Sequence, residues 1–269
     1  MSLAAIPEVR PKPSAFKTAN EAAAVEAEAR RLAGELGLPA RRLTIRLRSV
    51  MMFLWAAVAV VILLSLVQDL LIFLVPEAGF SDRIYRLDLD TEASLPTWFS
   101  SGLMLVCALT LLAISLQVAH EGRLKALPWF LLSAAFFFVS LDEAISLHEW
   151  LSAAIGAQVN NTGLFYFVWT VPALVACIVG LACFLPFILS FKGFDRALLI
   201  GSAAVFLSGA IGVEMLGGIE AEVAGIETLK YRLLSTLEET LEFAGLLIFL
   251  LFLLRRLRAA HNRTTICFD

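Results

Sequence analysis

The chain has 269 residues, of which 59% are hydrophobic, and its formal net charge is −3. A soluble domain is about 45–50% apolar, so the composition argues against an ordinary water-soluble enzyme and indicates a membrane protein. The four cysteines include no Cys-x-x-Cys pair, which argues against a disulfide framework and against a thiolate zinc site.

The N-terminal part of the chain differs in composition from the rest. We expect a disordered tail over 1–17, because this segment is polar and punctuated by proline. Thr18 followed by Glu21 fits a helix capping box, so 18–48 should form a cytoplasmic amphipathic helix and a linker. The apolar stripe of this helix either packs against the chain's own membrane domain or binds a protein partner through 18–37. The polar start also argues against a cleavable signal peptide.

Six apolar stretches follow, each long enough to cross a bilayer as a helix. The predicted fold is an all-α, polytopic membrane helix bundle over 49–255, followed by a cytoplasmic tail over 256–269. The six predicted transmembrane helices are 49–75, 98–118, 128–152, 164–190, 195–218 and 231–254.

Basic residues are distributed unequally between the two sides of this bundle. They concentrate before the first helix, in the second and fourth connections, and after the last helix: Arg41, Arg42, Arg46, Arg48, Arg123, Lys125, Lys192, Arg196, Arg255, Arg256 and Arg258. Cytoplasmic loops carry an excess of Lys and Arg, so both the N-terminus and the C-terminus are predicted to be cytoplasmic. We expect a multipass protein of the cell membrane, specifically a bacterial inner membrane.

The predicted helices carry acidic residues at depths where a charge is costly. Most of them belong to the segments LDEAISLHE and EETLE, which lie at similar depths because the third helix runs outward and the sixth runs inward. At about 100° per residue, Asp142, Ser146 and Glu149 share one face of the third helix. The candidate site residues are Asp142, Glu143, His148, Glu149, Glu214, Glu238, Glu239 and Glu242.

Together with Asp69, this set puts eight acids inside the predicted helices, and no Lys or Arg lies in a helix interior. A charged Asp at the centre of a membrane helix costs about 2.5–3.5 kcal/mol, so the acids must be neutralised by protons, by water or by a bound cation. Carboxylates with a single imidazole suit a hard divalent ion. The predicted cofactor is therefore Mg²⁺, Mn²⁺, Ca²⁺ or iron.

This residue set resembles the carboxylate-bridged di-metal sites of four-helix bundles, although the Glu-x-x-His pairs of those sites are absent. A metal-bound water of lowered pKa would support hydrolysis or oxidation of a lipid-like substrate, with His148 as a ligand or as the catalytic general base. Two alternatives stay open. The acids could form the relay of a proton- or cation-coupled transporter, or the chain could be a non-catalytic assembly or scaffold subunit. The lipid bilayer is an expected partner, and nucleic acid is not.

Overall fold

In the computed structural model, the described residues are Glu28, Arg31, 46–75, Glu77, 83–156 and 161–261. The described residues from Arg46 to His261 belong to one compact unit. The predicted tail over 1–17, nearly all of the predicted amphipathic helix, and the segment 262–269 lie outside the described residues.

All elements in the described part of the chain are helical, which confirms the all-α prediction. In chain order they are α2 (Leu47–Leu74), η2 (Tyr85–Leu87), α3 (Leu95–Ala119), α4 (Arg123–Ile145), α5 (Leu147–Gly156), η3 (Gly163–Phe165), α6 (Thr170–Ser190), α7 (Gly193–Leu207), η4 (Ser208–Val213), α8 (Glu214–Ala224) and α9 (Leu229–His261).

In the described ranges, five helical segments are long and apolar enough to cross a membrane, which fits a multipass membrane protein. They are α2, α3, α4, α6 and the continuous run Gly193–Ala224, in which α7, η4 and α8 follow one another. The 33-residue helix α9 is longer still, but it is more highly charged. It carries three glutamates in its first half and three arginines near its end.

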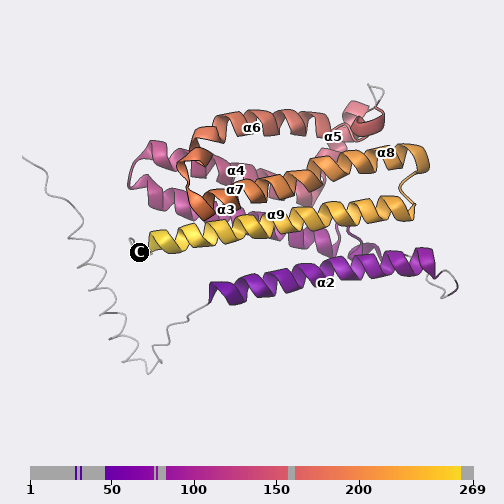
Figure 1. Cartoon of the computed structure of the whole chain (residues 1–269), viewed down its shortest axis with the longest axis horizontal. Helices are drawn as coiled ribbons and strands as arrows, with labels where there is room; N and C mark the ends of the chain where they lie inside the picture. The colour runs from indigo at the N-terminus through magenta and orange to yellow at the C-terminus, as the bar shows by residue number, and fades with distance from the viewer. Residues whose placement is uncertain are drawn as a thin grey trace, which may run out of the picture. The chain divides into compact units, whose positions relative to one another are not determined.

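Helix α9 lies at the centre of the packing. Figure 1 shows it between α2 on one side and the α7–α8 run on the other. Its middle part supplies many of the most buried side chains of the core: Phe243, Leu246, Leu247, Leu250, Phe252 and Leu253. Close approach of α7 depends on Gly245, because a Cβ atom at this position would lie 2.6 Å from the Cβ atom of Phe206. This apolar half of α9 is thereby held firmly, and it determines where the acidic half points.

Several predicted helix boundaries differ from the structure, and two of the differences change the path of the chain. The predicted third helix, 128–152, is interrupted, because α4 ends at Ile145 and Ser146 adopts the left-handed conformation with a φ of 55°. A left-handed residue ends a helix, so α5 begins as a separate helix after it. The predicted fourth helix, 164–190, begins only at Thr170, after the short 3-10 turn η3.

Helix α6 is the least covered of the long helices. Of its residues only Thr170 is buried, and Figure 1 shows α6 along one edge of the bundle. Its other side chains, which are almost all apolar, are therefore partly or fully exposed. A helix of this kind satisfies its own backbone hydrogen bonds and is suited to contact with lipid.

Candidate metal site

The interruption after α4 brings Asp142 and His148 together. The backbone N–H of His148 donates to Asp142 Oδ1 at 2.8 Å, and His148 Nδ1 lies 3.1 Å from Asp142 Oδ2. The predicted single face of Asp142, Ser146 and Glu149 is wrong, because the chain leaves the α-helical path at Ser146. Asp142 instead orients the imidazole, which leaves Nε2 as the ring nitrogen that can face a ligand.

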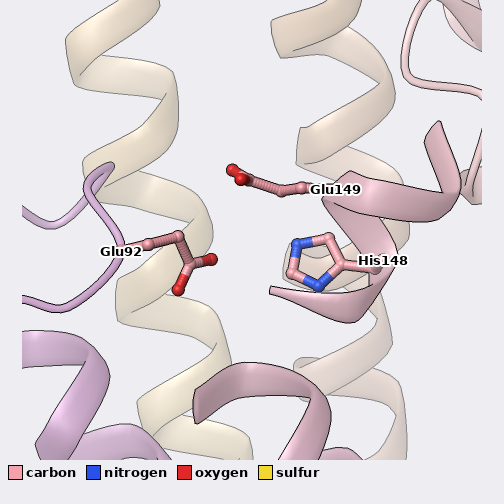
Figure 2. A group of neighbouring side chains, drawn as sticks. All are labelled: Glu92, His148 and Glu149. Carbon is pink, nitrogen blue, oxygen red and sulfur yellow. The ribbon is translucent and has the colours of Figure 1, made fainter. Parts of the chain in front are cut away.

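Glu92 joins this pair from a different part of the chain. It lies in the connection before α3, two residues before Ser94, whose side chain caps that helix. Ligand atoms of Glu92, His148 and Glu149 all lie within 4.8 Å of one another. Figure 2 shows the three side chains turned toward one another, Glu92 from the connection and the other two from the start of α5. Within the described ranges, these residues form the one such group of three possible metal ligands.

The sequence pattern does not point to Glu92, because Glu92 lies outside the predicted helices. One signal could have found it. Glu92 lies six residues before the second predicted helix, and His148 lies near the end of the third. These two helices run in opposite directions, so both residues belong to the same end of the bundle.

The electrostatics of this group favour a positive charge between the side chains. Glu92 Oε2 is buried and has no hydrogen-bond partner among the described residues. Burial raises the pKa of Glu92, a hydrogen bond from Ser146 lowers it, and the charge of Glu149 raises it again. Burial lowers the pKa of His148, but the hydrogen bond and charge of Asp142 outweigh burial and leave this pKa raised. An unbonded carboxylate oxygen beside an oriented imidazole fits a bound cation.

Trp169 connects this group to a second set of acids. The ring centroids of Trp169 and His148 are 5.0 Å apart. The indole Nε1 of Trp169 donates a hydrogen bond to Glu214 Oε1 at 2.9 Å, and Glu214 is in turn hydrogen-bonded to Glu238. Glu214 directly follows the π-helical segment η4, and such segments within α-helices are frequent at functional sites.

The remaining predicted acids gather around one turn of α9. Gly209 in η4 packs against this turn, since a Cβ atom there would lie 2.7 Å from the backbone oxygen of Glu238. Glu143 on α4 lies close enough for its charge to act on both Glu239 and Glu242. The structure therefore brings acids from α4 and α9 into one neighbourhood, and none of these four belongs to the group of three possible ligands.

Other acids at this end have cationic partners that the sequence pattern conceals. Arg83, from the connection after α2, forms an ion pair with Asp69. Arg232, at the start of α9, lies 3.2 Å from Asp88 and 2.8 Å from Asp90. The expectation that Asp69 lacks a side-chain cation is wrong, because the connection folds inward and carries its arginine to the end of α2.

Residues 53–257 match the family described as a domain of unknown function, DUF8692. The chain belongs to this family. The match begins within α2 and ends within α9, so it includes the candidate metal site and the ion-paired connection. No curated protein and no solved structure matches the chain.

Proposed function

We propose that this chain is a membrane protein that binds a divalent metal ion through Glu92, His148 and Glu149. The observation that supports this proposal best is the convergence of one imidazole and two carboxylates, with ligand atoms within 4.8 Å, from two separate elements of the fold. Within the part of the chain that the structure describes, the buried Oε2 atom of Glu92 has no hydrogen-bond partner that would offset its desolvation. Asp142 acts as the outer hydrogen-bond partner that metal-binding histidines generally have.

The chemistry of the donors indicates the class of metal and of reaction. Two carboxylates and one imidazole suit Mg²⁺, Mn²⁺, Ca²⁺ or iron, and the imidazole favours iron within this set. When bound, such an ion supplies a water of lowered pKa or polarises a substrate oxygen. His148 contributes through Nε2, while Asp142 keeps Nδ1 engaged and the ring oriented. A lipid-like substrate is proposed because apolar, exposed helices surround this end of the bundle.

We further propose that α9 is a sixth transmembrane helix and that both termini are cytoplasmic, in the cell membrane of a bacterium. The excess of Lys and Arg before α2, in the α3–α4 and α6–α7 connections, and at the end of α9 supports this orientation. Reporter fusions at Asn161 and Arg263 should report opposite sides of the membrane. Both fusions on one side would contradict the proposed topology.

A second candidate function is proton or cation transfer through the buried acids. The contact between the carboxyl groups of Glu214 and Glu238 favours it, with Trp169 holding Glu214 in place through a donated hydrogen bond. Chains of acidic side chains inside a membrane are typical of proton relays and cation pathways.

Elemental analysis of the purified protein in detergent tests the metal proposal. The wild-type chain should contain one of the metals named above, and Glu92→Gln and His148→Ala should each lose it. The melting temperature should fall in parallel, because a metal present at about 100 times its dissociation constant stabilises the fold by about 2.7 kcal/mol.

Glu121→Gln is a matched control, since it removes one exposed carboxylate from the opposite end of the bundle. This variant should retain both the metal and the wild-type melting temperature. A metal-free wild-type protein whose melting responds neither to a chelator nor to added Mn²⁺ or Fe²⁺ would refute the metal proposal and favour the relay.

A further inference from the structure

The end of the bundle opposite to the metal site contains a cavity of about 870 Å³. It lies between the α3–α4 turn, the end of α6, the start of α7 and the end of α9. Lys125 on its wall precedes Asp142 by 17 residues of α4, which corresponds to about 25 Å along the helix. The volume falls within the range of about 300–1,000 Å³ that is usual for sites of small molecules.

The inner wall of this cavity is aromatic. The ring of Trp129 lies 5.0 Å from that of Phe187 and 5.9 Å from that of Phe191, and both pairs are edge to face. Trp129 is only 5% exposed although it lines the cavity, so little of its surface is open to the surroundings of the bundle. These rings form an apolar backing to the cavity, so an occupant would lie next to them without touching most of their surface.

The rim of the cavity is cationic. Lys125, Lys192 and Arg256 all line it. Lys125 lies 3.6 Å from Glu121, and Arg256 lies 3.6 Å from Asp195. Both ion pairs are substantially exposed and contribute little stability, so a competing anion can replace the carboxylates at low cost. Among the described side chains, none forms an ion pair with Lys192.

One further polar group in the wall lacks a partner. Gln117 Oε1 is buried and accepts no hydrogen bond within the described part of the protein. An occupant with a hydroxyl group would satisfy this amide oxygen, which otherwise bears the cost of desolvation.

Helix α6 leaves an apolar path from the cavity into the bilayer. Cys183 and Pro186 of α6 line the cavity, while Leu181 and Leu185 on the same helix are 60% and 46% exposed. A molecule with an anionic head and an apolar chain could therefore place the head at the rim and the chain along α6.

We propose that this cavity binds an anionic phospholipid of the surrounding bilayer with a hydroxyl-bearing head group, such as phosphatidylglycerol. The phosphate lies between Lys125 and Lys192, the head-group hydroxyl donates to Gln117, and one acyl chain follows α6 past the wall that contains Trp129. Basic pockets between transmembrane helices are characteristic sites for the head groups of such lipids. This lipid site shares no residue with the proposed metal site, so the two proposals stand or fall separately.

Quenching of Trp129 fluorescence tests the lipid site. The full chain is reconstituted into phosphatidylcholine vesicles that contain a small fraction of phosphatidylglycerol brominated on its acyl chains. The chain has four other tryptophans. Subtracting the fluorescence of Trp129→Phe from that of the wild type cancels their signal and leaves the contribution of Trp129. Brominated phosphatidylglycerol should quench this contribution more strongly than the same fraction of brominated phosphatidylcholine.

Variants at the rim then show whether head-group recognition causes the preference. Lys125→Ala and Lys192→Ala should each lower the preference for phosphatidylglycerol over phosphatidylcholine about fivefold. One cation near the membrane surface strengthens the binding of an anionic lipid by about this factor. Arg123→Ala removes the same charge from the same end of the bundle but outside the cavity wall, and it should keep the preference.

Three results would overturn the proposal. Equal quenching of Trp129 by both brominated lipids would show that the head group is not recognised. Absence of quenching by either lipid would show that no acyl chain enters the cavity. Relief of quenching by inorganic phosphate would assign the cationic rim to a soluble anion instead.

Discussion

Two groups of acids at the metal-site end of the bundle are neutralised in different ways. In the first group, Asp69, Asp88 and Asp90 face arginines from the connection after α2 and from the start of α9. In the second group, the three glutamates of α9 form no ion pair with Lys or Arg in the part of the chain that the structure describes. Both groups lie on elements that pack against one another, so the difference is in their partners.

This difference separates structural charge from charge that is available for function. A buried ion pair keeps both of its members charged, and removal of one member leaves an uncompensated charge. A buried carboxyl without a cationic partner is stable only as the neutral acid or with a bound cation. We therefore interpret the arginine-paired acids as part of the fold, and the glutamates of α9 as groups that can exchange protons or approach a metal.

The largest expected effect comes from removal of a buried cation. Arg232 is 5% exposed, and Arg232→Met would leave Asp88 and Asp90 without their shared partner. We expect a loss of about 3–5 kcal/mol in the free energy of unfolding, measured by denaturation in detergent.

Lys125→Met is the control, because it breaks an ion pair in which both side chains are exposed. Lys125 is 66% and its partner Glu121 57% exposed, so this variant should lose no more than about 1 kcal/mol. Equal effects of the two variants would show that the ion-paired group does not contribute to the fold in the way we describe.

A smaller, pH-dependent effect is expected at Asp90. Burial raises the pKa of Asp90 from 3.8 to about 6, although the charge of Arg232 opposes the increase. Because this pKa is higher in the folded than in the unfolded chain, ionisation of Asp90 destabilises the fold increasingly as the pH rises through that range. The free energy of unfolding of Asp90→Asn relative to the wild type should therefore increase between pH 3.8 and about pH 6, by at most about 3 kcal/mol. A difference that is constant over that range would contradict this assignment.

The smallest effect is expected in the group without cations. If Glu239 is a neutral acid, Glu239→Gln preserves its shape and hydrogen-bonding capacity, so stability should change by no more than about 1 kcal/mol. The metal content should also match the wild type, in contrast to Glu92→Gln. Loss of the metal from Glu239→Gln would extend the site to α9, as the sequence by itself predicts.

Local composition was sufficient to predict several features of this protein. The apolar stretches indicate an all-helical membrane bundle because a backbone in lipid must satisfy its own hydrogen bonds. The costly positions of Asp142 and His148 mark them as candidate site residues without any structure. These inferences depend only on residue type and on spacing along one helix, which the sequence contains directly.

Tertiary structure alone decided which of these residues meet. The left-handed conformation of Ser146 turns the chain so that Asp142 contacts His148, and no helical periodicity predicts that turn. Glu92 reaches His148, and Arg83 reaches Asp69, because the connection after α2 folds back onto the bundle. Contacts of this kind depend on the path of a connection between helices. That path is determined by the packing of distant segments and not by the pattern of residues within any one of them.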